Sequence, residues 1–411
     1  MSVQASGWPA IRKVFSNRNY AVYTSGNSFS LIGLWVQRLA VGWLAWDLTK
    51  SGFWLGAVAF ADLFPIFIVG PFGGVIADWF DRRKVSLICQ SLSLCQASTL
   101  FFLTANGIIN IGLLFTLSLF QGIIVSFHQP TRLSLVRDLV PAEEITTAVA
   151  INSVSFNLAR FIGPAIAGLV ITRFGVATAF AVNAISFISM IIALIIIRLP
   201  PQRKQTQKKN ILFEASAGIR YAASHRAVGR IIFLMLVMAL LTRPVSDLLP
   251  GFADAVFSKG AEGLAIFTSA IGFGAIAGGI WIAQRGSNKG LPKIAMSSVI
   301  ISGLMVSLFS YTTHFWLAAA SMAVAGVSMV TCGVATQTMI QSAVEEQMRG
   351  RILSLWGMIF RGGPAIGALC LGWLSGFYGL SWPLGAAGGL SVCIVLLMLA
   401  FPISIHEQDQ F

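Results

Sequence analysis

The sequence of 411 residues contains little charge: only 10% of its residues are Asp, Glu, Lys or Arg, whereas 56% are hydrophobic. Soluble domains carry about 25% charged residues, so this chain cannot cover itself with a hydrated surface. The shortage of charge therefore excludes a soluble globular protein and favours a polytopic membrane protein. The 40 glycines are consistent with this class, because small residues allow membrane helices to approach one another closely.

The motifs of metal, disulfide and nucleotide chemistry are also missing. The five cysteines lie inside apolar segments without a Cys-x-x-Cys pair, and the four histidines, among them His128, are scattered singly and are expected to be structural. No Gly-x-x-x-x-Gly-Lys-[Ser/Thr] sequence is present to bind ATP. We therefore expect no enzyme activity, no cofactor and no metal.

Twelve apolar segments of roughly 20–28 residues are long enough to cross a bilayer core about 30 Å thick. We predict spans at 20–47, 52–78, 84–106, 109–136, 146–170, 175–197, 230–253, 263–284, 292–312, 315–341, 352–377 and 381–404. The first 20 residues are polar and amphipathic and show no cleavable signal peptide. The predicted fold class is an all-α integral membrane protein with two six-helix bundles.

The distribution of Lys and Arg predicts the orientation. When the loops are assigned alternately to the two sides, the side of the termini takes 21 of the 28 Lys and Arg, and the opposite side holds only Lys50, Arg173 and Lys259. The other four, Arg38, Arg160, Arg243 and Arg361, lie within spans. The positive-inside rule therefore predicts cytoplasmic termini. The net charge of +13 is explained by these loops, and no nucleic-acid partner is expected.

The longest polar segment, "RLPPQRKQTQKKN", runs from Arg198 to Asn210 at the middle of the chain. We interpret it as a linker, followed by a basic helix of roughly Leu212 to Ser224 at the cytoplasmic surface. The predicted domains are an N-terminal six-helix bundle at 1–197, a cytoplasmic linker and surface helix at 198–229, and a C-terminal six-helix bundle at 230–411.

The two halves resemble each other. "EEITTAVAINSVSFNLARFIGPAIAG" begins at Glu143, and "EEQMRGRILSLWGMIFRGGPAIGA" begins at Glu345. Each has two glutamates, an apolar run, an arginine and a Gly-Pro-Ala-Ile sequence. Duplicated bundles are typical of secondary transporters, which place the substrate site between the repeats.

The densest group of charges lies in "GPFGGVIADWFDRRKV", Gly70 to Val85. It resembles the signature loop of the major facilitator superfamily, with the pattern at Gly74, Asp78, Arg82 and Arg83. Two positions depart from the pattern: Asp81 stands where glycine is more common, and Trp79 stands where arginine is common. With these two residues, the motif is similar to that of the branch that contains enterobactin-type and macrolide-type exporters. The resemblance covers the whole chain and implies the twelve-helix major facilitator fold.

In such a loop, Asp78 is expected to lie near the start of the eleventh span. A helix N-terminus carries about half a positive charge, so Asp78 can latch the two halves on the cytoplasmic side. Arg82 and Arg83 would hold Asp78 and neighbouring carbonyl groups. The alternative is that Arg82, Arg83 and Lys84 only determine topology.

Span five contains "ARFIGPAIAG", which is similar to a Gly-Pro motif of superfamily antiporters. The residues of this motif are Gly163, Pro164 and Gly168. Proline lacks an amide hydrogen and bends a helix where neighbouring groups can satisfy the freed carbonyl. The resemblance implies export by antiport, although Gly-Pro also has simple packing uses.

Ionised side chains within the membrane are costly and need a reason. Arg38 and Asp62 lie at similar predicted depth in adjacent spans, and Arg243 and Asp247 lie one helical turn apart in span seven. Burial raises the pKa of a carboxyl group and a nearby arginine lowers it, so protonation can break such a pair. Asp62 is the preferred proton carrier and Asp247 the second candidate; the alternative is that both are structural pairs.

Further polar residues in the spans are candidates for lining a substrate cavity. They are Asn27, Gln37, Gln121, Asn157, Arg160, Gln337 and Arg361. Arg160 and Arg361 occupy matching places in the two repeats and can receive an anionic group. Hydrogen bonds between helices explain the amides equally well.

These patterns predict a secondary transporter of the bacterial inner membrane that exports small amphiphilic molecules, drug-like or siderophore-like, by proton antiport with alternating access. The alternatives are a dedicated exporter of one metabolite, a lipid transporter, and a receptor or scaffold with the same fold. The predicted partners are a small-molecule substrate, protons and the lipid bilayer, and a monomer is expected to suffice. Sodium as the driving ion stays open.

Overall fold

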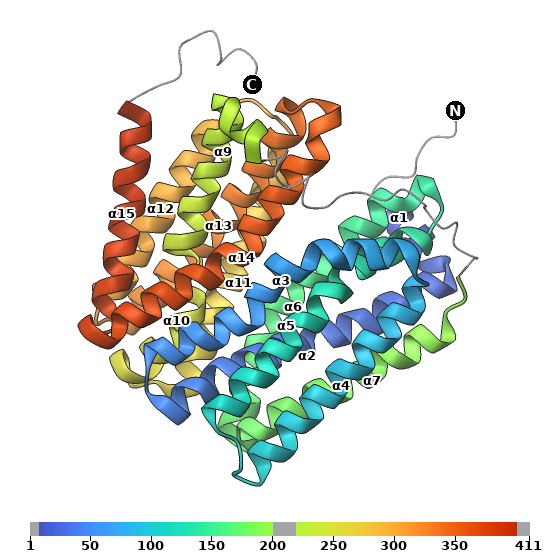
Figure 1. Ribbon diagram of the computed structural model, residues 1–411, viewed down its shortest axis with the longest axis horizontal. Coiled ribbons are helices and arrows are strands. Elements are labelled where there is room, and N and C mark those ends of the chain that lie inside the picture. The colour runs from blue at the N-terminus through green and yellow to red at the C-terminus, as the bar shows by residue number, and fades with distance from the viewer. Residues whose placement is uncertain (1–7, 200–218, 401–411) are drawn as a thin grey trace. The chain divides into compact units, whose positions relative to one another are not determined.

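The computed structural model describes residues 8–199 and 219–400, and these ranges are built from helices joined by short connections (Figure 1). Within them, 12 helices are long and apolar enough to cross a membrane. The prediction of an all-α, multi-pass membrane protein is confirmed. The predicted linker at 198–229 falls largely outside the described residues, and of the expected surface helix only 219–224 is described, as helix.

Residue contacts divide the chain into two compact units. Unit 1 comprises 1–44 and 68–207, and unit 2 comprises 45–67 and 208–411. Helices α2 (Arg18–Thr49) and α3 (Gly52–Trp79) therefore contribute to both units. The predicted domains differ at 45–67, which they assign to the N-terminal bundle, and they stay a prediction.

Unit 1 holds six further elements. They are α1 (Trp8–Ser16), α4 (Arg82–Ala105), α5 (Ile111–Asp138), η1 (Ala142–Glu144), α6 (Ile145–Phe174) and α7 (Val176–Ile196). Helix α4 packs against both α5 and α7. Tyr20 and Tyr23 of α2 are almost fully buried in the apolar cluster at one end of this unit, and the hydroxyl of Tyr20 donates to the carbonyl of Ala148 on α6 at 3.1 Å.

Two helices of unit 1 begin at capping side chains. The Asp81 carboxylate accepts from the amides of Arg83 and Lys84 at the start of α4, and the Asn110 side chain accepts from Leu113 at the start of α5. Such caps satisfy amides that have no partner within the helix. They also explain why the charged loop ends where it does.

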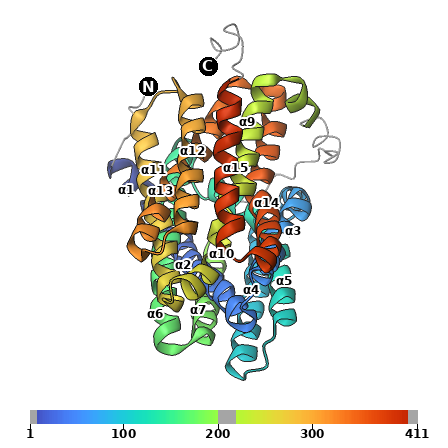
Figure 2. The same cartoon turned by 90° about the vertical axis from the view of Figure 1, so that its left-hand side faces the viewer.

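Unit 2 contains the remaining elements. They are α9 (Arg226–Val237), η2 (Met238–Thr242), α10 (Val245–Gly251), η3 (Phe252–Val256), α11 (Gly260–Arg285), α12 (Leu291–Tyr311), α13 (Phe315–Ala343), α14 (Glu346–Tyr378) and α15 (Ser381–Ala400). Helix α13 packs against α11 and α12, and α12 also packs against α15 (Figure 2).

The seventh span, predicted at 230–253, is one candidate span at Arg226–Val256, and its α-helix is interrupted within that span. Two π-helical turns, η2 and η3, follow α9 and α10, and the amide of Arg243 bonds to the carbonyl of Met238, five residues earlier. Pro244 supplies no amide to continue the helix. Irregular turns of this kind are frequent at functional sites, and they place Arg243 and Asp247 at a break in the helix.

The two repeated segments each form one long helix that continues through its proline. Pro164 lies inside α6 and Pro364 lies inside α14. The similarity that the sequence shows between these segments is therefore matched by similar local structure.

Candidate functional site

A polar cavity of about 50 Å³ lies within unit 1, enclosed by α2, α4, α5, α6 and α7. Its polar lining consists of Asn27, Ser30, Gln90, Ser93, Gln121, His128, Gln129 and Arg132. Phe156 and Phe187 add aromatic surface to the lining. A cavity of this size holds one or two water-sized groups and not a whole drug-sized molecule.

Helix α5 provides the three most polar groups of the cavity. Gln121, His128 and Arg132 are separated by seven and four residues, which places them on one face of the helix. Gln121 and Arg132 are 4% and 5% exposed. A buried glutamine and arginine on one stripe inside a membrane span indicate a functional surface, because such groups are expensive to insert.

The imidazole of His128 is held by Gln90 of α4. The side-chain Nε2 of Gln90 lies 3.2 Å from Nε2 of His128. An amide nitrogen only donates, so the ring nitrogen accepts and the imidazole is neutral in this arrangement. The contact fixes the orientation of the Gln90 amide.

Several buried atoms around the cavity have no hydrogen-bond partner among the described residues. They are Oε1 of Gln90, Oε1 of Gln121 and Nε of Arg132. Most buried polar atoms in proteins are paired, so a group of three unpaired atoms on one cavity needs an explanation. The cavity offers one donor and two acceptors to a bound group.

Arg132 carries a buried charge without a carboxylate. Among residues 8–199 and 219–400, the ion pairs involve other cations. The guanidinium of Arg132 lies 6.0 Å from the ring of Phe156, a weak cation–π contact. A buried cation of this kind favours the binding of an anion.

Two more arginines of unit 1 lie at a neighbouring aromatic ring. The guanidinium carbons of Arg38 and Arg160 are 5.5 Å and 5.6 Å from the centre of the Trp35 ring. Trp35 in turn makes an edge contact with Phe156 at 5.9 Å. We call these three arginines and two rings, Arg38, Arg132, Arg160, Trp35 and Phe156, the arginine–aromatic cluster.

The predicted cavity amides have different surroundings. Gln37 donates to Gln96 at 3.0 Å and accepts from Asn183 at 2.8 Å, so its amide joins α2, α4 and α7. Asn157 donates to the carbonyl of Ser153 in its own helix. Gln37 bonds to side chains of other helices, as the alternative interpretation expects, and Asn157 bonds within its own helix. Asn27 and Gln121 line the cavity.

In unit 2, Arg243 lies against Phe360 of α14. Its guanidinium is 3.9 Å from the ring centre and donates to the Phe360 carbonyl at 2.9 Å. Phe360 stacks on Trp356 at 4.8 Å, and the Trp356 indole donates to Thr336 at 3.0 Å. Arg243 therefore sits at the end of an ordered aromatic column.

The other predicted residues of unit 2 are placed as follows: Asp62 is half-buried on α3, Asp247 is half-buried on α10, Gln337 is half-buried on α13, and Arg361 is exposed on α14. Their roles in coupling and substrate binding stay predictions.

The charged loop is held by specific contacts. Arg82 donates from Nη1 to both carboxylate oxygens of Asp138, at 2.8 Å and 2.7 Å. Arg83 donates to the carbonyls of Leu194 and Ile195 at the end of α7. Arg83 therefore contacts backbone carbonyls and Arg82 contacts the Asp138 carboxylate, and the expected contact of these arginines with Asp78 stays a prediction. Gly74 and Asp78 belong to α3, but the surroundings of the Asp78 side chain lie outside the described residues.

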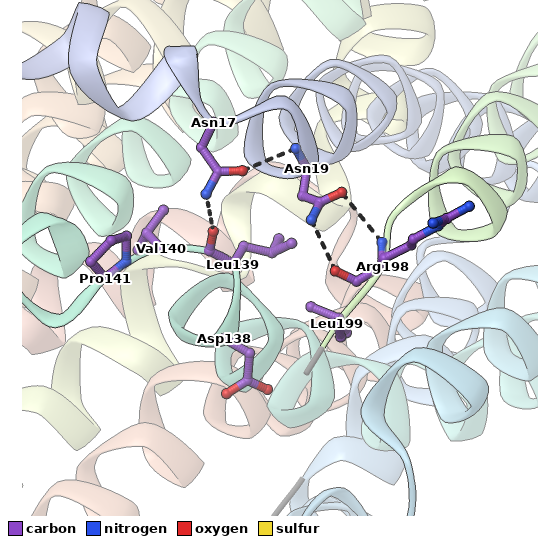
Figure 3. Close-up of a pocket in the computed structure, with 8 residues that line it drawn as sticks. All are labelled: Asn17, Asn19, Asp138, Leu139, Val140, Pro141, Arg198 and Leu199. Atoms are coloured by element: carbon purple, nitrogen blue, oxygen red, sulfur yellow. Dashed lines mark hydrogen bonds between the residues drawn. The ribbon is translucent and has the colours of Figure 1, made fainter. Parts of the chain in front are cut away.

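A second, more open pocket of about 320 Å³ lies next to this ion pair (Figure 3). Asn17 donates to the carbonyl of Leu139 at 2.8 Å, and the Asn19 side chain exchanges two hydrogen bonds with the backbone of Arg198. These amides are satisfied by the protein, so the pocket reflects how the end of α7 is tied to α2.

The Gly-Pro motif of α6 lies where that helix crosses α2. A Cβ atom added at Gly163 would meet the Cβ of Trp35 at 2.5 Å. Pro164 and Gly168 are also buried. The glycine of the motif therefore permits the close contact between α6 and α2 at Trp35, the ring beside which Arg38 and Arg160 lie.

A cluster of polar contacts in unit 2 joins the end of α2 to η3. The indole of Trp46 donates to Asp254 at 2.8 Å, and Nζ of Lys50 lies 3.1 Å from Asp254 and 3.1 Å from Asp47. Partial burial lowers the pKa of Lys50, but the hydrogen bonds that Lys50 donates to Asp47 and Asp254 raise it by more, so the net shift is upward. Lys50 thus stays charged.

Sequence reasoning missed the cavity residues Gln90, His128 and Arg132. Arg132 lies near the end of the predicted span 109–136, and the structure shows it buried on α5. The available signal was the spacing of Gln121, His128 and Arg132, which places three polar groups on one helical face.

A sequence profile described as "transmembrane secretion effector" matches residues 10–411. The chain is 28% identical over 403 residues to the enterobactin exporter EntS of Escherichia coli (strain HS), which covers 95% of this chain and 91% of that protein. It is 24% identical over 384 residues to the staphyloferrin A transporter of Staphylococcus aureus (strain NCTC 8325 / PS 47), which covers 91% and 94%.

Solved structures share the fold at low sequence identity. The nucleoside transporter NupG gives a TM-score of 0.71 at 14% identity and covers 93% of this chain and 98% of that one. A bacterial homologue of the human lysosomal transporter Spinster gives 0.71 at 13% identity and covers 96% and 97%. The relatives and the structural neighbours are transporters and not enzymes.

Proposed function

Because the chain belongs to the transmembrane secretion effector family of the major facilitator superfamily, we propose that it exports a small anionic metabolite of the siderophore class across the bacterial inner membrane. Membership makes it a multi-pass membrane transporter of small molecules. The direction of transport, the siderophore class of the substrate and the location in the inner membrane are what we propose beyond family membership. The names of the relatives, an enterobactin exporter and a staphyloferrin A transporter, support this substrate class.

The observation that carries the proposal is the arginine–aromatic cluster of unit 1. Three arginines lie within 6.0 Å of two aromatic rings, and one of them, Arg132, is buried and has no carboxylate partner among the described residues. Guanidinium groups bind carboxylates and other oxyanions through paired donors, and rings support flat organic groups. A substrate that carries several acidic oxygens on an organic scaffold is matched to this surface.

We propose that the transport cycle exchanges the substrate for protons by alternating access. The half-buried carboxylates Asp62 and Asp247 are the candidate proton carriers, and Arg38 and Arg243 are further candidates for proton coupling. The interrupted seventh span, with Arg243 and Asp247 at its break, supports a moving part at this position. We also propose that both termini are cytoplasmic and that the signature loop, Gly74, Asp78, Arg82 and Arg83, gates the cytoplasmic side.

Export of drug-like compounds is a second candidate function. Phe60, Phe64 and Phe67 form a ladder of stacked rings on α3, with centres 4.3 Å and 6.1 Å apart. Such a surface favours apolar, uncharged or cationic amphiphiles rather than polyacids.

The test is uptake into inverted membrane vesicles with an acidic lumen, with enterobactin, staphyloferrin A and a cationic dye as separate substrates. We expect accumulation of a siderophore that an ionophore abolishes and that is absent from vesicles without the protein. Accumulation of the dye alone would favour the drug exporter. Accumulation of neither siderophore would contradict the proposed function.

A further inference from the structure

The cavity of unit 1 is lined by buried hydrogen-bonding groups that have no partner among the described residues, and together they require a particular kind of ligand. One buried donor, Nε of the cationic Arg132, and two buried acceptors, Oε1 of Gln90 and Oε1 of Gln121, have no partner among the described residues. All three side chains line one cavity of about 50 Å³. A simple anion would satisfy the arginine but would leave both acceptors unpaired.

We propose that this cavity is a subsite for an acidic oxygen with a neighbouring hydroxyl group, as in an α-hydroxy or ortho-hydroxy carboxylate or a singly ionised catechol. The acidic oxygen pairs with Arg132, and the hydroxyl donates to Gln121 or Gln90. The subsite rests on the proposed function, because it would bind one such group of the exported molecule.

The size of the cavity agrees with a group and not with a whole molecule. The cavity volume of about 50 Å³ is far below the roughly 300–1,000 Å³ of a pocket for a whole small molecule, so the cavity accommodates a carboxylate or a pair of adjacent oxygens. The rest of the substrate must lie outside, beside Phe156, which forms part of the lining. A ring that bears the two oxygens can rest there against the aromatic face.

His128 acts as a positioning residue for this subsite. Its Nε2 accepts from the amide nitrogen of Gln90 at 3.2 Å, which turns Oε1 of Gln90 away from the imidazole. A histidine that could not accept would allow the amide to rotate and would remove one acceptor from the cavity. The subsite therefore depends on an imidazole nitrogen without a proton.

The pairing of a cation with two acceptors distinguishes the subsite from a plain anion site. Benzoate has the acidic oxygen alone, catechol has the adjacent hydroxyls without a full charge at neutral pH, and salicylate has both features. The subsite should therefore bind salicylate more tightly than benzoate or catechol, and the preference should depend on Gln121.

The experiment measures the affinity of purified protein in nanodiscs for these three probes, by quenching of tryptophan fluorescence and by calorimetry. We expect Arg132→Met to weaken salicylate binding at least tenfold and Gln121→Leu to weaken it several-fold, while benzoate binding is unchanged in Gln121→Leu. The exposed Arg173→Met is the matched control and should bind salicylate as the wild type does.

Equal affinity of the wild type for salicylate and benzoate, or unchanged salicylate affinity in Arg132→Met, would overturn the subsite. Because Arg132→Met removes a buried group, Gln121→Leu is the second variant, with His128→Phe as a test of the positioning role. His128→Phe should reduce the preference for salicylate over benzoate without abolishing benzoate binding.

The outcome is separable from that of the proposed function. If the probes bind as expected but no siderophore is transported, the proposed export fails and the subsite stands. If siderophore uptake is present and is unaffected by Arg132→Met and Gln121→Leu, the export stands and the subsite is wrong.

Discussion

The indole nitrogen of Trp46 donates a 2.8 Å hydrogen bond to the carboxylate of Asp254, which lies 208 residues later in the chain. Lys50 reaches the same carboxylate at 3.1 Å. Within unit 2, this pair of contacts ties the end of α2 to the interrupted seventh span. The Asp254 carboxylate therefore accepts hydrogen bonds from both Trp46 and Lys50 and connects them to the interrupted part of the seventh span.

Replacement of Asp254 by Asn should lower the thermal stability of the purified protein. The variant loses the charge that accepts from both Trp46 and Lys50, and hydrogen bonds to charged groups contribute about 1.5–3 kcal/mol when buried. The side chain is 33% exposed, so we expect about 1 kcal/mol. Asp47→Asn is the matched control: its carboxylate is 56% exposed and, among the described residues, its ion pair is with Lys50, so its melting temperature should stay within error of the wild type. Equal losses in the two variants would contradict the role of Asp254.

The contribution of Lys50 should be independent of pH over the neutral range. The pKa of Lys50 is raised in the folded state by its hydrogen bonds to Asp47 and Asp254. A raised pKa means that the stabilisation is complete below the ordinary pKa of the ammonium group and is lost as the pH rises through the folded-state value. The difference in melting temperature between wild type and Lys50→Met should thus be constant from pH 6 to pH 9 and should shrink above that range. A difference that changes between pH 6 and pH 8 would be inconsistent with this assignment.

Enlargement of Gly163 should disturb the contact of α6 with α2. A Cβ atom there meets the Cβ of Trp35 at 2.5 Å, so Gly163→Val must displace one helix and should cost about 1–3 kcal/mol of stability, with reduced transport. Ala165, exposed on the same helix, is the matched position, and Ala165→Val should be close to neutral. Unchanged stability and transport in Gly163→Val would show that the contact is looser than the structure indicates.

The ion pair of Arg82 with Asp138 separates a structural role of the charged loop from a purely topological one. The pair is partly buried, with side chains 21% and 24% exposed, so Arg82→Gln should lose about 1 kcal/mol of stability and much of the transport activity. Lys84→Gln removes one cation from the same loop at an exposed position and should preserve both. If the two variants behave alike, the cations act only through their number and the loop determines topology.

Much of the fold could be predicted from the sequence because membrane spans are encoded locally. Long apolar runs and loop charges are visible in any window of about 20 residues, and twelve such helices are present among the described residues. The break in the seventh span was not predicted. Pro244 marks it, but the π-turn before it depends on where the carbonyl of Met238 finds a partner.

The candidate site could be predicted only in part. Asn27 and Gln121 were recognised as polar residues in apolar spans, and both line the cavity. A single histidine has no partner nearby in the sequence, so the sequence predicts a structural role for His128. Its contact with Gln90, 38 residues earlier, joins α5 to α4. The pairing of Arg82 with Asp138, 56 residues away, likewise leaves no local pattern.

The measurement that tests the account most directly is the luminal pH of inverted vesicles when a siderophore is added without an imposed gradient. Antiport predicts that protons leave the lumen as substrate enters, so the luminal pH should rise with wild-type protein and should not change with Asp62→Asn, while Asp47→Asn behaves as the wild type. Siderophore uptake without any change in luminal pH, or an unaltered response in Asp62→Asn, would contradict proton antiport through Asp62.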